Sequence, residues 1–122
     1  MARILVIDDD EVSIKITKLR LTSAGFEVTS HHGPFGSLNA IRKGEYDLIL
    51  LDIRMPGLDG PGLMRLIRTT PGLERTKILL HSSMDTDALE ELVKTHRAHG
   101  YISKSCRADA LTAKIHETIR AP

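Results

Sequence analysis

Acidic residues follow two apolar runs of the sequence, at the points where those runs end. The run 4–7 leads directly into Asp8 and Asp9, and the run 48–51 leads directly into Asp52. In open α/β folds the carboxyl ends of buried parallel strands meet at one edge of the sheet, where ligands bind. Carboxylates gathered there repel one another and favour a hard cation, and Mg²⁺ is the usual one where phosphate is handled. The sequence therefore predicts an acidic site for magnesium-assisted phosphate chemistry.

A hydroxyl group and an ammonium group extend this pattern to two more strand ends. The apolar stretch 78–81 is followed by Ser82, and Lys104 comes shortly after the stretch 100–102. The order Asp-Asp, Asp-x-x-x-Pro-Gly, Ser and Lys, each at the end of a predicted strand, resembles the receiver domain of two-component response regulators. Each motif is weak by itself, but the ordered set is specific, and the resemblance covers nearly the whole chain.

The resemblance implies a chemical role for each acid. Asp52 would be the nucleophile, which attacks a phosphoryl group in line and becomes an aspartyl phosphate. Mg²⁺ would be the cofactor, bound directly by Asp9 and Asp52, by Asp8 through a water molecule, and by the backbone carbonyl of Arg54. Phosphoryl transfer depends mainly on positioning and on neutralising charge, which these ligands would provide.

The resemblance also implies how the phosphoryl group would be held. Lys104 would pair with Asp52 before the reaction and with a phosphoryl oxygen afterwards, as a compact point charge suited to that exchange. Ser82 would donate its hydroxyl to another phosphoryl oxygen. The turn that follows Asp52 carries Pro56 and Gly57, which are typical residues for a tight reversal of the chain.

Tyr101 matches the switch aromatic of the family. It would turn inward as Ser82 moves toward the phosphoryl group, altering the face made by the helix 85–96, the strand 100–102 and the helix 108–119. A downstream protein would read that face, and the phosphate would come from a sensor histidine kinase or a phosphotransfer protein. An amphipathic ring at the edge of a sheet explains Tyr101 equally well.

Each site residue also has a simpler interpretation. The acids at Asp8 and Asp9 are typical of a loop that leads into a helix cap, and Asp52 is typical of a turn. Ser82 alone is typical of a strand end, and Lys104 alone of a solvated surface. Their joint occurrence at successive strand ends favours the site, because independent surface residues have little reason to show that pattern.

Length and composition indicate one ordinary globular domain, and we expect the range 1–122 to be a single receiver domain that accepts phosphate. The chain has 122 residues, 41% of them hydrophobic, and a formal net charge of +1, so it has no overall attraction to nucleic acid. The single cysteine, Cys106, excludes an internal disulfide, and the first apolar run is too short for a signal peptide or a membrane span. We therefore expect a cytoplasmic protein that binds neither nucleic acid nor membrane directly.

Short apolar strands alternate with helical patterns along the whole chain, which indicates βαβ units and a parallel sheet. Right-handed crossovers between such strands place helices on both faces. The strand order 2-1-3-4-5 of flavodoxin-like α/β folds is implied by the resemblance, and it places the ligand site between the first and third strands. We predict five strands, at 3–7, 27–30, 48–51, 77–81 and 100–102.

The helices are bounded by capping residues and glycines. Asp10 is expected to cap the first helix and Gly25 to end it. The third helix begins at Gly60 and is stopped by the sequence Thr70-Pro71-Gly72. The other predicted helices are 11–24, 34–43, 85–96 and 108–119.

Two details of these helices are open to a structural test. In the first helix, Val12, Ile16 and Leu19 recur at helical spacing, and we expect this stripe to face the core. Gly36 is expected inside the second helix, where a glycine costs about 1 kcal/mol relative to alanine.

Two positions depart from the pattern of the family. Relatives usually have a proline after the lysine, joined through a cis peptide bond, but here Ser105 follows Lys104. A cis bond before a residue other than proline costs roughly 3 kcal/mol, so we expect a trans peptide or local strain. His81 stands where relatives carry an aliphatic residue, and strand alternation should turn it away from Ser82 toward a helix-covered face. We expect His81 to be partly buried and hydrogen-bonded.

The leading hypothesis is a single-domain response regulator that catalyses only its own phosphorylation and dephosphorylation. One alternative is a receiver-like scaffold that works without phosphorylation, for which Ser105 leaves room. A less favoured alternative is a Mg²⁺-dependent phosphohydrolase that acts through an aspartyl phosphate. Such an enzyme needs a second acid and a cap over the substrate, and the chain has no spare domain for a cap. The sequence identifies neither the kinase nor the output partner.

Overall fold

Five parallel strands form the central sheet in the computed structural model of the chain, which describes residues 2–55, 57 and 60–122 and, for 60 and 61, only the backbone. Neighbouring strands are parallel throughout, in the order β2-β1-β3-β4-β5. This confirms the predicted flavodoxin-like topology, and every strand boundary lies within two residues of its predicted position. The strands are β1 (Arg3–Asp8), β2 (Glu27–His32), β3 (Leu48–Leu51), β4 (Ile78–Ser82) and β5 (Gly100–Ser103).

The register of the central strands places the carboxyl ends of β1 and β3 side by side. Ile7 of β1 is paired with Leu51 of β3, and Leu51 is paired with Leu80 of β4. One residue beyond the first pair, the N–H of Asp52 donates a 2.9 Å hydrogen bond to the carbonyl of Ile7. The acids that follow the two strands therefore emerge next to each other at one edge of the sheet.

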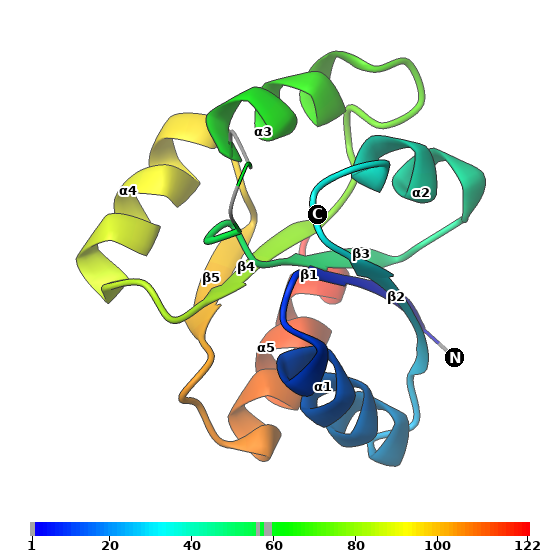
Figure 1. Cartoon of the computed structure of the whole chain (residues 1–122), viewed down its shortest axis with the longest axis vertical. Helices are drawn as coiled ribbons and strands as arrows, with labels where there is room; N and C mark the ends of the chain where they lie inside the picture. The colour runs from blue at the N-terminus through cyan, green and yellow to red at the C-terminus, as the bar shows by residue number, and fades with distance from the viewer. Residues whose placement is uncertain (1, 56, 58–59) are drawn as a thin grey trace.

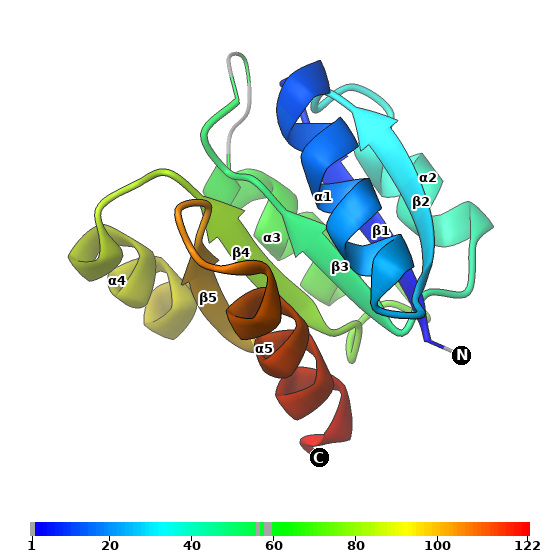
Figure 2. The same ribbon diagram turned by 90° about the horizontal axis from the view of Figure 1, so that it is seen from below.

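Helices cover both faces of the sheet, as Figures 1 and 2 show. One face carries α1 (Glu11–Ser23) and α5 (Ala108–Arg120). The other carries α2 (Ser37–Lys43), α3 (Gly60–Thr69) and α4 (Thr86–His96). Within the part of the chain that the structure describes, no helix combines the length and the apolar character needed to cross a bilayer.

Each face of the sheet has its own hydrophobic core, because alternate residues of a strand point to opposite sides. In β1, β3 and β4, consecutive residues are therefore buried on both faces, which explains the continuous apolar runs of the sequence. The core under α1 and α5 contains Ile4, Val6, Leu21, Phe26, Leu48, Leu50, Leu79, Leu111 and Ile115. The core under α2, α3 and α4 contains Leu5, Ile7, Ile41, Ile49, Leu51, Met55, Leu63, Met64, Ile67, Ile78, Leu80 and Leu89.

The buried and exposed sides of α1 are the reverse of those predicted. Val12, Ile16 and Leu19 are 63%, 48% and 71% exposed, whereas Ile14 and Leu21 are buried. Successive residues of an α-helix are offset by about 100°, so these two sets lie on nearly opposite sides of the helix. Both sets have helical spacing, and contact with the sheet decides which one packs. An apolar stripe on α1 is therefore left at the surface.

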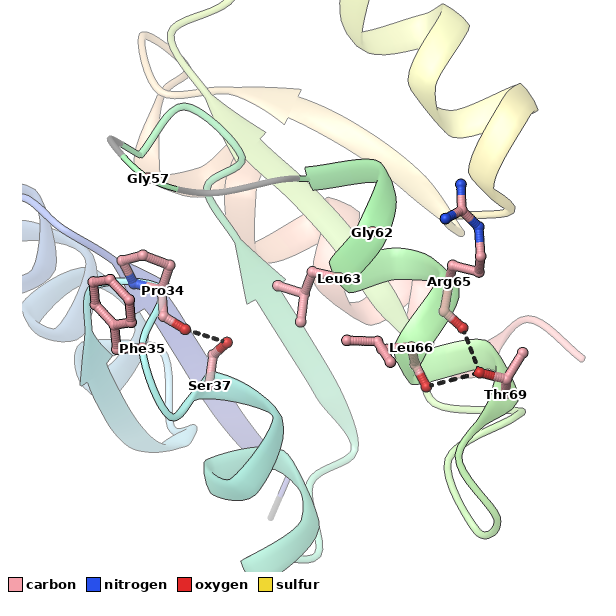
Figure 3. Close-up of a pocket in the computed structure, with 9 residues that line it drawn as sticks. All are labelled: Pro34, Phe35, Ser37, Gly57, Gly62, Leu63, Arg65, Leu66 and Thr69. Carbon is pink, nitrogen blue, oxygen red and sulfur yellow. Dashed lines mark hydrogen bonds between the residues drawn. The ribbon is translucent and has the colours of Figure 1, made fainter.

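The second helix is shorter than predicted, because it begins at Ser37 rather than at Pro34. Gly36 does not lie inside the helix but caps it in the left-handed region, with φ of 76°, which a glycine adopts at little cost. The hydroxyl of Ser37 donates to the carbonyl of Pro34 and closes the turn (Figure 3). Between this turn and α3 lies a shallow groove of about 470 Å³, which is bordered by the exposed side chains of Phe35 and Leu66.

The capping of α1 follows the prediction. The side chain of Asp10 accepts a 3.0 Å hydrogen bond from the N–H of Val12, which satisfies one of the free N–H groups at the start of the helix. The helix ends at Ser23 with Ala24 as its C-cap, and Gly25 follows with φ of 94°, the left-handed conformation expected of a terminating glycine.

Candidate functional site

The three predicted acids meet at the carboxyl edge of the sheet. Asp8 is the last residue of β1, Asp9 follows it, and Asp52 is the first residue after β3. Each offers a carboxylate oxygen, and these atoms all lie within 4.8 Å of one another. Asp8 and Asp52 are only 1% and 5% exposed, so two of the three carboxylates are nearly removed from water. Burying them together is costly unless cations or hydrogen bonds compensate for their charge.

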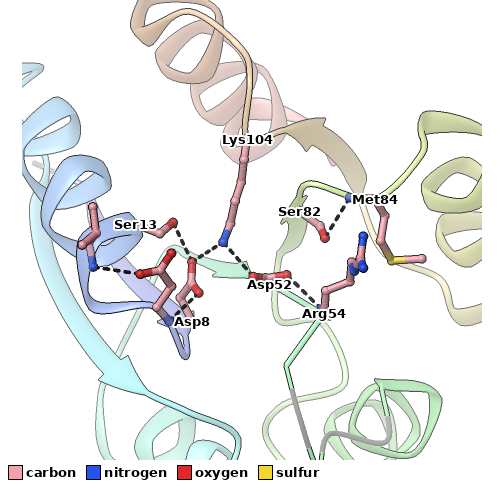
Figure 4. A network of polar contacts seen from close by, with 9 residues as sticks. Asp8, Ser13, Asp52, Arg54, Ser82, Met84 and Lys104 are labelled. Carbon is pink, nitrogen blue, oxygen red and sulfur yellow. Dashed lines mark hydrogen bonds and ion pairs between the residues drawn. The ribbon is translucent and has the colours of Figure 1, made fainter.

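Lys104 supplies one such cation, as Figure 4 shows. Its Nζ atom lies 2.7 Å from Oδ2 of Asp8 and 2.7 Å from Oδ2 of Asp52. The backbone holds the lysine there, because the N–H of Lys104 donates a 3.0 Å hydrogen bond to the carbonyl of Ser82 at the end of β4. The structure thus brings together strand ends that are far apart in the sequence.

The two buried acids also accept hydrogen bonds from nearby groups. Asp8 accepts from the N–H of Asp10 at 3.1 Å and from the hydroxyl of Ser13 at 2.9 Å. Asp52 accepts from the N–H of Arg54 at 2.9 Å through its other oxygen, Oδ1. Ser13 was not predicted as a site residue. The sequence does contain a signal for it, because Ser13 lies five residues after Asp8, in the first turn of a helix that starts beside this acid.

Lys104 and Asp8 stabilise each other's charged forms. Burial alone would raise the pKa of Asp8, but hydrogen bonds from Lys104, the Asp10 N–H and Ser13 bring it below its ordinary value. Burial alone would likewise lower the pKa of Lys104, but its hydrogen bonds to Asp52 and Asp8 raise it above the ordinary value. At neutral pH the pair is therefore fully ionised.

The charge that remains at the site fits a divalent cation. Three carboxylates and one ammonium group leave a formal charge of −2 within a few ångströms. Oxygen ligands and a partly buried, doubly negative cluster suit Mg²⁺, which binds through one or two carboxylates and keeps several waters. Asp9 is less buried than its neighbours and makes no ion pair with any residue that the structure describes, so its carboxylate is free to serve as a ligand. The residues present therefore fit the predicted cofactor.

Ser82 lies at the same edge and is fully buried. Its Oγ accepts a 3.3 Å hydrogen bond from the N–H of Met84, so its hydroxyl proton is not used in that contact (Figure 4). Tyr101, in β5, is partly buried and packs against the core that contains Leu89. Pro56 of the predicted turn lies outside the described residues, and Gly57 has φ of 78°.

Lys104 contacts Asp8 and Asp52 although Ser105 stands where relatives usually have a proline. The described part of the chain contains no cis peptide bond, so the peptide between Lys104 and Ser105 is trans, as predicted. The N–H of Ser105 donates to the hydroxyl of Ser103 at 3.2 Å, and the two hydroxyls lie 2.8 Å apart. A local hydrogen-bonded turn therefore directs Lys104 toward the acids without a proline.

His81 is more deeply buried than predicted and lacks the predicted hydrogen bond. It faces the α1 side of the sheet and is only 4% exposed, but its Nε2 atom has no hydrogen-bond partner among the described residues, so it is not the hydrogen-bonded histidine that was expected. Burial lowers the pKa of His81 to about 4, and the nearby charge of Lys104 adds to this effect. The histidine is neutral at pH 7. It lines a small cavity of about 230 Å³ that also reaches Lys104, Arg20 and the start of α1.

Comparison with known proteins agrees with this geometry. The chain matches the family model of the response regulator receiver domain over residues 4–116. It is 30% identical over 117 residues to the uncharacterized transcriptional regulatory protein YkoG of Bacillus subtilis (strain 168). The matched region covers 96% of this chain and 50% of YkoG. The chain spans about half the length of the first curated relatives that it matches.

Two solved structures are similar over almost their full length. The signal receiver domain of a response regulator from Bermanella marisrubri is 31% identical, with a TM-score of 0.85 and coverage of 97% of this chain and 98% of that one. The response regulator TrrA from Thermotoga maritima, solved in complex with Mg²⁺-BeF, is 30% identical, with a TM-score of 0.84 and coverage of 97% and 99%. A family match of this length, together with the shared fold, shows that the chain belongs to the response regulator receiver domain family.

Proposed function

We propose that this chain accepts a phosphoryl group on Asp52 from a phosphohistidine donor and signals through an altered protein-binding surface. The observation that carries the proposal is the buried carboxylate of Asp52, held 2.7 Å from Lys104 beside two further acids. A carboxylate oxygen of Asp52 forms a bond to phosphorus while the bond from phosphorus to the histidine nitrogen breaks. The donor nitrogen keeps the electron pair of the broken bond, and the protonation state of the donor histidine readjusts with solvent.

Asp9 and Asp52 would hold Mg²⁺ directly, with Asp8 through water and the backbone carbonyl of Arg54 as a further ligand. When bound, the ion supplies positive charge that neutralises phosphoryl oxygens. Lys104 supplies the rest of the positive charge. Because it contacts two acids, exchange of its Asp52 contact for a phosphoryl oxygen leaves its contact with Asp8 in place.

The phosphorylated state would be read through Ser82 and Tyr101. Ser82 is buried at the site with its hydroxyl proton available, so it can donate to a phosphoryl oxygen. Movement of Ser82 and the following residues toward the phosphoryl group would let the side chain of Tyr101 turn inward. Tyr101 is only partly buried. The surface formed by α4, β5 and α5 would change as a result, and a downstream protein would bind it.

The exposed stripe of α1 is a suitable contact for the phosphohistidine donor. Val12 and Ile16 line the small cavity that reaches Lys104, and Leu19 continues the stripe one turn further along the helix. Exposed apolar side chains next to a reactive group are typical of a protein interaction surface. A sensor kinase or phosphotransfer protein that packs on this stripe would bring its phosphohistidine to Asp52.

Phosphorylation by acetyl phosphate in Mg²⁺ tests the acceptor assignment. We expect the wild-type chain to become labelled and the variant Asp52→Asn to remain unlabelled, as measured by intact-protein mass spectrometry. The matched control is Asp109→Asn, which removes an exposed acid in the first turn of α5 that pairs with Arg107 rather than with a site residue, and it should be labelled normally. Labelling that survives Asp52→Asn would refute the acceptor assignment. Absence of labelling in every variant would favour a scaffold that works without phosphorylation.

The donor surface is tested by comparing two phosphate sources. The variant Leu19→Glu should accept phosphate from acetyl phosphate at the wild-type rate but from a cognate phosphohistidine protein more slowly. Leu66→Glu places the same charge on an exposed leucine of α3, on the other face of the sheet, and serves as the control. Equal rates for Leu19→Glu and Leu66→Glu with the protein donor would contradict the proposed contact.

A further inference from the structure

A strongly basic pocket lies at the edge of the sheet opposite the acidic site. It has a volume of about 510 Å³ and sits where α3 ends, β4 begins, α4 leads into β5 and α5 ends. Figure 2 shows α5 ending at the lower edge of the molecule, away from the arrowheads of β3 and β4. The residues that line it are Arg68, Glu74, Arg75, Lys77, Arg97, His99, Ala121 and Pro122.

The cations of this pocket outnumber its one acidic side chain. Arg68 donates to the carbonyls of Thr76 and Arg97, each at 2.8 Å, and Lys77 donates to the carbonyls of Thr118, at 3.0 Å, and Ala121. These contacts satisfy hydrogen-bonding capacity but leave the net charge in place. The four permanent cations and the single acid of the pocket, Glu74, leave a formal side-chain charge of +3, and no ion pair joins any of them to a described residue.

Burial and neighbouring positive charges lower the pKa of two groups in this pocket, His99 and Arg68. Burial lowers the pKa of His99, and the charges of Arg68 and Lys77 lower it further. Burial also lowers the pKa of Arg68, and the charge of Arg97 adds to this. Nδ1 of His99 accepts a 3.1 Å hydrogen bond from the N–H of Ile78, so the proton of the neutral ring is on Nε2, and that atom is a donor.

Arg97 occupies an unusual backbone position for its residue type. It ends α4 in the left-handed conformation, with φ of 59°, and it is the only residue other than glycine with positive φ in the described chain. A glycine would adopt this conformation at less cost, because an L-residue loses roughly 1 kcal/mol there. Strain of this kind that persists in a fold points to a use for the side chain. The side chains of Arg97 and Arg75 are exposed and have no partner among the described residues.

We propose that this pocket binds a small anion that carries two or more phosphate groups, such as a pyrophosphate or a nucleoside polyphosphate. Guanidinium groups match phosphate oxygens in a two-pronged geometry, and they are less strongly hydrated than ammonium groups. An excess of positive side-chain charge is matched by a polyvalent anion better than by a single phosphate. The concave shape and the volume suit a small ligand rather than a long polymer. Bound there, the anion would link the ends of α3, α4 and α5, and this site is independent of phosphorylation at Asp52.

Calorimetric titration of the whole chain in Mg²⁺-free buffer tests the proposal, with inorganic phosphate, pyrophosphate and adenosine diphosphate as probes. We expect pyrophosphate and the nucleotide to bind at least about tenfold more tightly than phosphate, because each additional charge-assisted contact adds about that factor. The affinity should fall as ionic strength rises.

Two substitutions locate the site. Arg75→Gln and Arg97→Gly should each weaken pyrophosphate binding by about tenfold. Glycine is chosen at position 97 because it keeps the left-handed backbone, so a loss of binding reports the missing cation rather than a distorted α4 terminus. Arg107→Gln removes one exposed cation outside the pocket, where it pairs with Asp109, and should bind as the wild type does. Asp52→Asn should also leave pyrophosphate binding unchanged.

Three results would overturn the proposal. These are pyrophosphate binding no tighter than phosphate binding, wild-type affinity in the two pocket variants, and a loss of binding in Arg107→Gln as large as theirs. Each would show that the attraction comes from general surface charge rather than from this pocket.

Discussion

The Nζ atom of Lys104 lies 2.7 Å from Oδ2 of Asp52, across 52 positions of sequence. The same nitrogen lies 2.7 Å from Asp8, so one ammonium group is shared by two buried carboxylates. This arrangement places the lysine where it competes electrostatically with a divalent cation for the same acids. It also places the lysine where a phosphoryl group on Asp52 would meet it.

Removal of this lysine should strengthen magnesium binding while it weakens phosphorylation. In Lys104→Met we expect the affinity for Mg²⁺ to rise by roughly threefold to tenfold, because a nearby like charge is lost. Labelling by acetyl phosphate should fall at the same time, because a phosphoryl oxygen loses its cation. A magnesium titration followed by NMR chemical shifts measures the first effect. Lys94→Met, at an exposed lysine of α4, is the control, and weaker Mg²⁺ binding in Lys104→Met would contradict the shared-lysine geometry.

The hydroxyl of Ser82 should matter for phosphorylation but little for stability. Ser82→Ala removes a donor for a phosphoryl oxygen, and we expect the rate of labelling by acetyl phosphate to fall by about tenfold. Ser82→Thr keeps the hydroxyl and should retain most of the rate. Urea unfolding should show that Ser82→Ala changes the free energy of unfolding by less than about 1 kcal/mol, because the only described bond of this hydroxyl is the one from Met84. A rate for Ser82→Ala equal to the wild-type rate would remove Ser82 from the site.

His81 should make the protein sensitive to mild acid. Its pKa is about 4 in the folded chain, against 6.5 for the free side chain, so the unfolded state binds the proton more readily. The contribution to stability is therefore complete above pH 6.5 and is lost as the pH falls from there toward 4. Between pH 7.5 and pH 5 the wild type should lose about 2 kcal/mol more than His81→Leu, which cannot titrate. Urea unfolding at the two pH values measures this difference. Equal losses in the two proteins would mean that His81 takes up its proton without cost.

The two sides of α1 should respond differently to truncation. Leu21 is fully buried, so Leu21→Ala should cost about 2–5 kcal/mol of unfolding free energy. Ile16 is about half exposed and Leu19 is mostly exposed. Their alanine variants should each change the free energy of unfolding by no more than about 0.5 kcal/mol. Chemical unfolding of the three variants makes the comparison. A large loss in Ile16→Ala would show that the apolar stripe packs within the protein after all.

Local sequence signals were sufficient to predict the elements of the fold. The strands β1, β3 and β4 are mainly apolar runs because they are buried on both faces, and each ends in or is directly followed by a polar residue at the edge of the sheet. Asp10 and Gly25 mark the ends of α1 through their own hydrogen-bonding and backbone properties. The strand order itself was predicted from the resemblance to receiver domains, since residue patterns do not specify which strands are neighbours.

The tertiary structure decided what depends on contacts between distant segments. The stripes on the two sides of α1 have the same helical period, and only packing on the sheet selects the one that contains Leu21. The missing hydrogen bond of His81 and the contact of Lys104 with Asp8 as well as Asp52 likewise depend on which atoms lie nearby in space. Period and residue type are local properties of the chain and can be read from the sequence. Burial, partners and shared charges arise only when the strands and helices are assembled.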